Sequence, residues 1–241
     1  SETERLLLIE CLIKLAAAKE RCLPGGKDYD IWELLKEAEK LLKCSYPRHS
    51  YPRHKAAIEY SRCRLAMRRE DDKRSWKTAI NAGKRALRYL SEASGSENCH
   101  FVVIPDPLEM ELMIAQCQMQ LGETASAAEA AQTALHTAEG NGMNRYSREA
   151  CELLQKISAA QKDWEGALRW GKRAVRYGDG TYRDYREGVF HFPISVQLPP
   201  LELCAEACRY LGRDEEERAY ILRIKALKES QERFGADRQD G

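Results

Sequence analysis

The sequence contains no run of eighteen apolar residues, so it predicts no membrane-spanning helix. It also lacks the short motifs of several enzyme classes: a glycine-rich phosphate loop, a GxSxG around a nucleophilic serine, and the zinc motif HExxH. Cysteine and histidine do not combine into CxxC or HxxxH pairs, so we expect no metal site. These absences favour a non-catalytic protein without a cofactor.

The N-terminal stretch SETERLLLIECLIKLAAAKE has an apolar centre, but acidic residues precede it and Lys14 interrupts it, which argues against a secretory signal. The nine cysteines are odd in number and irregularly spaced, and most fall within helical patterns. They indicate free thiols in a reducing compartment, and we expect Cys204 and Cys208 to be buried structural cysteines. We therefore expect a cytoplasmic or nuclear protein.

The net charge of +1 hides a strong asymmetry along the chain. Residues 43–90 hold fourteen Lys and Arg against four Asp and Glu, whereas residues 100–161 hold three against eight. Solvated helix faces of different sign explain such blocks. A basic patch that meets an acidic tail or a nucleic acid is the alternative.

An internal duplication relates two segments that lie 88 residues apart. WKTAINAGKRALRY at residues 76–89 and WEGALRWGKRAVRY at residues 164–177 share Trp, Ala, GKRA and RY without a gap. The separation is long enough for two helical hairpins in each copy. Residues 108–138 repeat the arrangement, with an apolar helical face, a break at Gly122 and a second helix that has alanines at a regular period.

This pattern of helix, tight turn and second helix with small residues at fixed positions resembles the tetratricopeptide repeat (TPR) family. A fourth unit at residues 201–227 fits more loosely. The signature positions of the first three units are Trp76, Ala79, Gly83 and Ala86, then Thr124, Ala127, Ala131 and Ala134, then Trp164, Ala167, Gly171 and Ala174.

The resemblance covers roughly residues 55–227 and implies an all-α fold, a right-handed superhelical solenoid of four to five antiparallel hairpins. Its repeats are longer than usual, since Ala79, Ala127 and Ala167 lie 48 and 40 residues apart, against a usual period of about 34. We expect an N-terminal helical hairpin and linker over residues 1–54, repeats over 55–235, and a disordered tail over 236–241.

Three segments are expected to interrupt the helices. HFVVIPDPLE at residues 100–109 and GVFHFPISVQLPP at 188–200 are apolar, β-branched and closed by proline, so we expect them to be extended. Each segment either folds back and packs against its pair of repeats, or forms an exposed apolar strip that binds a partner. SYPRHSYPRH at residues 45–54 is predicted to be a spacer, with recognition of RNA or a phosphopeptide as the alternative. We expect no acidic partner near its His49 and His54.

In the TPR family, the first helix of each hairpin lines a concave groove, and this resemblance implies a partner site. Arg64 and Arg68 match two positions of the family's two-carboxylate clamp, but Met113, Glu149 and Leu153 stand where further polar and basic residues are needed, so chaperone-tail recognition is disfavoured. The implied groove residues are Arg64, Arg68, Leu112, Gln116, Met119, Glu152 and Lys156.

The function that the resemblance implies is a non-catalytic scaffold that binds a peptide or partner subunit in its groove. The alternative is a helical-repeat protein that binds RNA or another nucleic acid through the basic region 43–90 and the two GKRA segments, which is less favoured because the acidic middle of the chain repels phosphate. The basic residues of those segments are Lys84, Arg85, Arg88, Lys172, Arg173 and Arg176.

Overall fold

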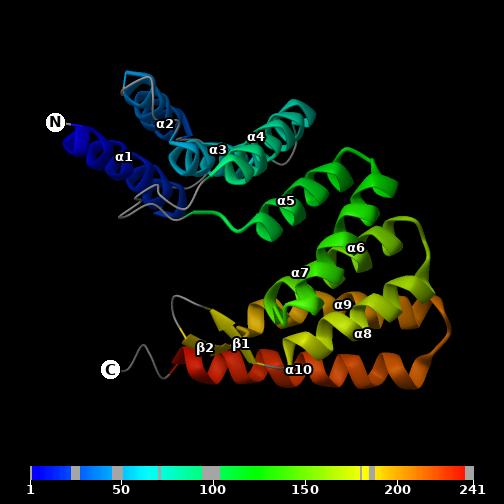
Figure 1. Cartoon of the computed structure of the whole chain (residues 1–241). Coiled ribbons are helices and arrows are strands. Elements are labelled where there is room, and N and C mark those ends of the chain that lie inside the picture. The colour runs from blue at the N-terminus through cyan, green and yellow to red at the C-terminus, as the bar shows by residue number, and fades with distance from the viewer. Residues whose placement is uncertain are drawn as a thin grey trace. The chain divides into compact units, whose positions relative to one another are not determined.

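The computed structural model describes residues 2–22, 28–44, 51–69, 72–93, 104–179, 181–184 and 188–236. Over these residues the chain forms ten α-helices, α1 to α10, and one short antiparallel strand pair (Figure 1). Within each unit, consecutive helices pack against one another, which confirms the predicted all-α class. The chain divides into two compact units, Ser1–Glu123 and Thr124–Gly241.

The first unit holds five helices, and α1 and α2 form the N-terminal hairpin that the sequence predicted. Ile9 and Ile13 of α1 pack with Ile31 and Leu35 of α2 and with Leu65 of α3 in one buried cluster. The hydrophobic face of α3 therefore covers the N-terminal hairpin. The helices are α1 (Glu2–Cys22), α2 (Asp28–Lys43), α3 (Pro52–Met67), α4 (Lys73–Glu92) and α5 (Pro107–Gln120).

A second cluster of the first unit joins α3, α4 and α5. Trp76, Ala79 and Cys63 are buried together with Met110 and other residues of α5. The Asp72 side chain begins α4 by accepting a hydrogen bond from the backbone N–H of Arg74. The buried apolar face of α4 thus contacts both α3 and α5.

The second unit repeats this arrangement with five helices and a strand pair. Helix α7 pairs with α8, α9 packs against α8, and α10 packs against α9. Strands β1 and β2 are antiparallel, with Thr181 opposite His191 and Asp184 opposite Gly188. The elements are α6 (Thr124–Gly140), α7 (Asn144–Ala160), α8 (Trp164–Gly178), β1 (Thr181–Asp184), β2 (Gly188–His191), α9 (Ile194–Tyr210) and α10 (Asp214–Ala236).

The expectation that residues 100–109 and 188–200 are extended is wrong in part. Residues 100–103 lie outside the described residues, but Pro107 occupies the first turn of α5, where its missing N–H costs nothing. Residues 188–191 form β2, whereas residues 194–200 belong to α9, with Pro199 and Pro200 inside the helix. Burial of Pro200 and its neighbour Leu201 explains why the helix persists despite the lost hydrogen bonds.

Of the duplicated SYPRHSYPRH, the structure describes residues 51–54. Residues 45–50, including His49, lie outside the described residues; α3 begins at Pro52. His54 is fully buried, and its Nε2 lies 3.1 Å from Oε1 of the buried Glu10 of α1. The expectation that no acidic residue lies near His54 is therefore wrong, because Glu10 is 44 residues distant in the sequence but adjacent in the packed helices. The expected tail begins inside α10, and residues 237–241 lie outside the described residues.

Candidate functional site

The signature small residues lie in the packed interior. Every signature alanine of the three units is fully buried, and both Gly83 and Gly171 are buried. A Cβ added to Gly83 would lie 2.8 Å from Cγ1 of Ile114, and one added to Gly171 would lie 2.4 Å from Sγ of Cys204. These positions let the following first helix approach its neighbour, so they build the fold and are not available to a ligand.

The first helices carry the more exposed positions. One equivalent position, five residues before the C-cap, is occupied by Gln116 in α5 and Lys156 in α7, and both side chains are exposed, whereas Arg68 is the C-cap residue of α3. The turns that follow α7 and α9 are 50 residues apart, so the same position in α9 is Glu206, which is also exposed. This glutamate was missed from the sequence, although its regular offset from Lys156 was a signal that could have found it.

The neighbouring position along these helices is less uniform. Leu112 in α5 is buried, so it belongs to the core of the first unit. Glu152 in α7 is half-buried, and Met119 at the end of α5 is half-buried as well. In α9 the equivalent residue is Glu202, which is exposed and pairs with Lys228 at 3.0 Å. The exposed part of the site is therefore mainly polar.

In the first unit, Arg64 and Arg68 are held by acidic and carbonyl groups of the N-terminal hairpin. Arg64 forms an ion pair with Glu20 at 3.0 Å, and Arg68 donates to the Glu20 carbonyl at 3.1 Å. Arg68 also lies 3.6 Å from Oδ1 of the buried Asp28. These contacts tie α3 to α1 and α2, so the positive charge of both arginines is already compensated within the unit.

In the second unit, α7 carries a buried arginine that was not singled out from the sequence. The Arg148 side chain is 6% exposed, donates to the Glu152 carboxylate and lies over the Phe192 ring at 4.9 Å from its centroid. Within the described residues, its Nε has no hydrogen-bond partner. Burial raises the pKa of Glu152, while the positive charge of Arg148 opposes that rise.

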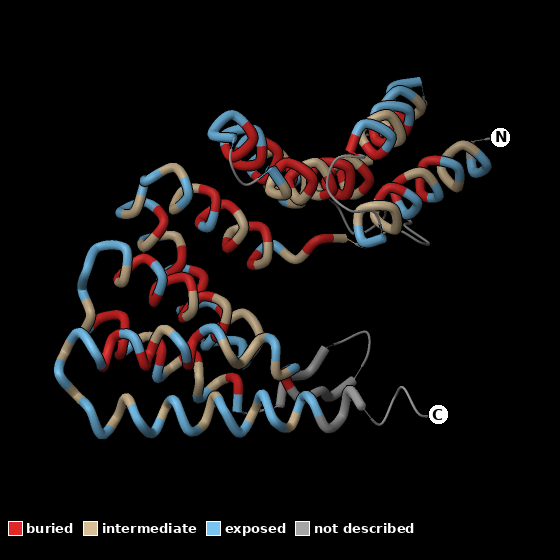
Figure 2. Tube along the Cα trace, turned by 180° about the vertical axis from the view of Figure 1, so that it is seen from behind, coloured by how far each residue is buried: buried red, intermediate tan, exposed pale blue. Residues whose placement is uncertain are grey.

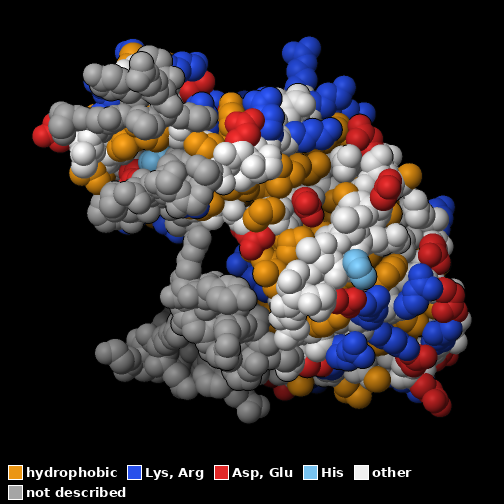
Figure 3. Space-filling model, viewed as in Figure 1, with side chains coloured by type: hydrophobic (Ala, Val, Ile, Leu, Met, Phe, Trp, Pro, Cys, Tyr) orange, Lys and Arg blue, Asp and Glu red, His pale blue; other side chains and the backbone are white. Residues whose placement is uncertain are grey.

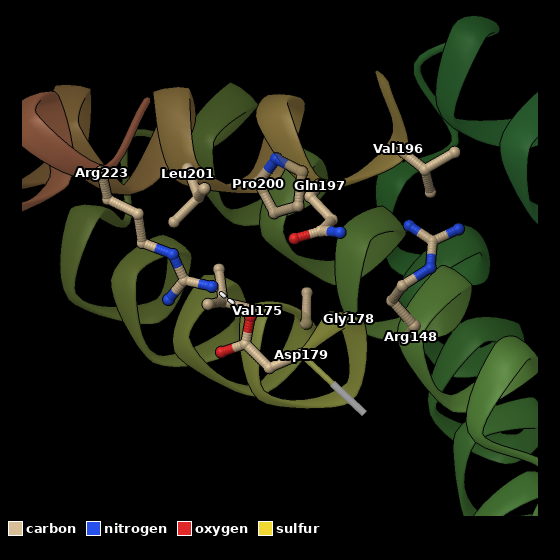
Figure 4. Close-up of a pocket in the computed structure, with 10 residues that line it drawn as sticks. Arg148, Val175, Gly178, Asp179, Val196, Gln197, Pro200, Leu201 and Arg223 are labelled. Carbon is tan, nitrogen blue, oxygen red and sulfur yellow. Dashed lines mark hydrogen bonds and ion pairs between the residues drawn. The ribbon is translucent and has the colours of Figure 1, made fainter. Parts of the chain in front are cut away.

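A small cavity lies beside Arg148 (Figure 4). Gly178 and Val175 of α8 form one wall, and Gln197 and Pro200 of α9 form the other. Figure 4 shows Arg223 reaching the Asp179 carboxylate across one side of the cavity, an ion pair that narrows it. About 10 Å³ remains, enough for about one water molecule, so this is not a small-molecule site.

The two basic segments lie on the second helices α4 and α8, as expected. Arg85 pairs with Glu59 at 2.8 Å, Lys172 pairs with Glu216 at 2.6 Å, and Arg173 binds the Glu139 carboxylate. The remaining members are Lys84, Arg88 and Arg176, all exposed. Figure 3 shows Lys and Arg side chains interspersed with Asp and Glu over the second unit. Pairing of this kind neutralises much of the charge that a phosphate backbone needs.

The cysteine, histidine and acidic side chains offer no second kind of site within the described residues. Over that part of the chain, Cys, His, Asp and Glu side chains form no group of three that could hold a metal ion. Among the helices that the structure describes, none combines the length and the apolar character needed to cross a membrane. Cys204 and Cys208 are both buried, as predicted, and burial raises the pKa of the Cys204 thiol to about 12.

Comparison with known proteins identifies the architecture. No family model matches the chain, and no curated protein matches it. The crystal structure of BtubC (BKLC) from P. vanneervenii superposes with a TM-score of 0.71 at 16% identity, over 95% of this chain and 82% of that one. The fold is TPR-like.

A second solved structure supports the same assignment. The crystal structure of a Podosopora anserina putative kinesin light chain with nearly identical TPR-like repeats has a TM-score of 0.62 at 15% identity, over 92% of this chain and 95% of that one. The TPR resemblance of the sequence is therefore confirmed. TPR-like folds are typical of protein-interaction scaffolds and are generally non-catalytic.

Proposed function

We propose that this TPR-like protein is a non-catalytic scaffold that binds an extended peptide or a segment of a partner subunit along its first helices. The observation that carries the proposal is a difference in exposure between the first and second helices of the hairpins. The small residues of the second helices are buried, whereas one equivalent position of the first helices leaves Gln116, Lys156 and Glu206 exposed. Exposed polar positions of this kind, taken within each unit, hold a partner by hydrogen bonds and shallow contacts.

In the second unit, the exposed row is mixed in sign. Lys156 of α7 is followed by Glu202 and Glu206 of α9, with Glu149 half-buried beside Arg145 at 3.1 Å. A partner segment that carries basic side chains opposite the α9 glutamates gains charge-assisted hydrogen bonds there. We therefore place the primary contact of the second unit on α7 and α9.

In the first unit, Arg64 and Arg68 stay in the proposed site as holders of one acidic group. An acidic ligand there competes with Glu20 and Asp28, which already pair with these arginines. Their contribution to affinity is then modest. Charge reversal at these two positions is a poor test, because it removes contacts that join α3 to the N-terminal hairpin.

The experiment compares two double variants of equal net charge. Lys156→Glu with Glu206→Lys changes exposed positions of the first helices, and Glu129→Lys with Arg176→Glu changes exposed positions of the second helices α6 and α8. Each protein is used for affinity capture from cell extract with identification by mass spectrometry. We expect the first variant to lose partners that the wild type and the second variant retain, with equal thermal stability for all three. Equal recovery of the same partners by both variants would remove these first helices from the binding site.

The reducing compartment that the cysteines indicate also belongs to this proposal. Among the described residues, three free thiols are exposed, those of Cys11, Cys22 and Cys44. Exposed free thiols persist in a reducing compartment, so we place the proposed function in the cytoplasm or the nucleus.

A further inference from the structure

We propose that the outer face of α4 is a second docking surface of the protein, which binds a short acidic segment of a protein partner. This surface lies on a second helix of the hairpins. It shares no residue with the first-helix site proposed above, and the inference does not depend on that site.

Four cations line the outer face of α4. Because successive residues of an α-helix are turned by about 100°, the four side chains fall within a sector of about 60°, and at a rise of about 1.5 Å per residue the row is about 22 Å long. All four residues are exposed; Figure 2 shows exposed and buried positions alternating along α4, and Figure 3 shows Lys and Arg side chains gathered over this helix. The α4 stripe consists of Lys73, Lys77, Lys84 and Arg88.

Three members of the α4 stripe have no counter-ion within the described residues. In that part of the chain, no carboxylate pairs with the side chain of Lys73, Lys77 or Lys84. Arg88 lies 3.6 Å from Glu92, and both side chains are exposed, so this pair is weak. The stripe therefore holds positive charge that is available to a partner, unlike the arginines that join α3 to the N-terminal hairpin.

The duplicated helix α8 shows how the same positions look when their charge is used inside the molecule. At the offset of 88 residues, Lys77 corresponds to Glu165 and Lys84 to Lys172. Glu165 and Lys172 each pair with an opposite charge in or just before α10, at 2.6 Å. The α8 copy is therefore neutralised by the next hairpin, whereas the α4 copy is not.

Helix α6 shows that a second helix needs no charge at these positions. The offset of 48 residues that relates Ala79 to Ala127 places Ala125 and Gln132 where α4 has Lys77 and Lys84. Both residues of α6 are exposed and uncharged. Packing of the repeats thus does not account for the α4 stripe, and binding of an anionic partner does.

The length of the α4 stripe favours a short acidic segment as the partner. Exposed carboxylates bound the stripe, with Asp72 before its first member and Glu92 after its last. A polyanion that runs beyond both ends, such as a nucleic acid, meets like charge there. An extended peptide of about seven residues spans about 22 Å, so it lies between the two carboxylates.

The aromatic residues of α4 argue against a single-stranded nucleic acid, which needs exposed rings on which its bases stack. Trp76 is buried, and the Tyr89 ring is covered by Lys55 at 5.6 Å and Arg88 at 5.0 Å from its centroid. The exposed neighbours of the stripe are polar as well, among them Asn81. Binding is therefore electrostatic, and we expect it to weaken as salt rises.

The test measures binding of a fluorescein-labelled peptide of eight glutamates by fluorescence anisotropy, with a peptide of eight serines as the uncharged probe. Lys77→Glu with Lys84→Glu changes the stripe. Arg176→Glu with Arg218→Glu is the matched control, because it changes the net charge equally at exposed residues of α8 and α10. All these positions are exposed, so we expect unchanged circular dichroism spectra and melting temperatures.

We expect the wild type and the control variant to bind the glutamate peptide and not the serine peptide. The stripe variant loses two attractions and gains two repulsions, so its dissociation constant is expected to rise about tenfold or more. The first-helix variant, Lys156→Glu with Glu206→Lys, is expected to bind the glutamate peptide as the wild type does. Failure of the first-helix site and failure of the α4 surface are thereby distinguished.

Three results would overturn the proposal. The first is a wild type that does not bind the glutamate peptide even at low salt. The second is equal weakening in the stripe variant and the control variant, because net charge alone would then explain the binding. The third is tighter binding of a single-stranded RNA of eight nucleotides than of the glutamate peptide, lost in the stripe variant, which would make a nucleic acid the partner of this face.

Discussion

Substitution of Gly171 by alanine tests whether this glycine sets the approach of α9 to α8. The added Cβ would lie 2.3 Å from Nε2 of Gln155 and 2.4 Å from Sγ of Cys204. Both neighbours are buried, and Gln155 is held by its hydrogen bond to the Pro200 carbonyl. Relief of these overlaps requires about 1 Å of movement in a packed region.

The magnitude follows from two opposing effects. Overpacking of this kind costs about 1–3 kcal/mol of unfolding free energy, whereas replacing a mid-helix glycine by alanine gains about 0.5–1 kcal/mol. We therefore expect Gly171→Ala to lower the stability of the second unit by about 1–2 kcal/mol, which corresponds to a fall of a few degrees in melting temperature.

The control substitution lies in the same helix. A Cβ on Gly178 would have its nearest neighbours at 3.7 Å and 3.9 Å, which are ordinary contacts. Gly178→Ala is expected to leave the melting temperature unchanged or to raise it slightly. Urea and thermal unfolding followed by circular dichroism measure both variants.

A double-mutant cycle identifies the cause of the loss. If Gln155 is the group that clashes, Gly171→Ala is expected to cost less in a Gln155→Ala background than in the wild type, with a coupling energy of about 0.5–3 kcal/mol. Strict additivity in the cycle would assign the clash to Cys204, and a Gly171→Ala protein as stable as the wild type would refute the packing argument.

Four further outcomes are expected. Lys162→Gly should raise the unfolding free energy by about 0.5–1 kcal/mol, because Lys162 holds a φ of 60° at a position that suits glycine; thermal unfolding measures it. His54→Ala should lower it by about 1–3 kcal/mol, since it leaves the buried Glu10 without this partner; Arg53→Ala on the half-buried face is the comparison in denaturant unfolding. In the native protein, thiol reagents should modify the exposed Cys11 quickly and the buried Cys151 slowly, because burial raises the pKa of Cys151 to about 12; mass spectrometry after short labelling measures both. RNA binding, measured by fluorescence anisotropy, should be weak and lost by about 200 mM salt; submicromolar, sequence-selective binding above that salt would favour the nucleic-acid hypothesis.

The fold could be predicted from the sequence because its signature residues act locally. Gly83 and Gly171 sit in identical GKRA contexts, and each lies where a following first helix makes close contact. The period of small and apolar residues along one helix is enough to reveal such contacts. Proline is a weaker guide, because its effect depends on position: Pro107 starts α5, and Pro200 is tolerated inside α9 by burial.

The candidate site was less predictable because its residues are defined by partners far along the chain. A groove alignment places Arg64 and Arg68 on the first helix, but the alignment does not show that Glu20 and Asp28 of the preceding hairpin pair with them. For the same reason, the contact between His54 and Glu10, which lie 44 residues apart, could not be predicted from the sequence. Charge compensation of this kind arises only when two hairpins pack, so a count of residues 43–90 overstates the free positive charge.

This compensation bears directly on the choice between a protein partner and a nucleic acid. Arg62 of α3 contacts Glu39 of α2 at 2.6 Å and Glu59 at 2.9 Å, and Arg85 of α4 contacts the other oxygen of Glu59 at 2.8 Å. A phosphate backbone that recruited these arginines would have to separate them from carboxylates that are themselves half-buried or buried, and an unpaired buried carboxylate is costly. Counterion release then gives little net affinity, because these cations hold protein carboxylates in place of mobile ions. Arg62 and Arg85 of the basic stretch therefore act as an electrostatic joint between α2, α3 and α4, which leaves the exposed polar positions of the first helices as the better candidate for a partner.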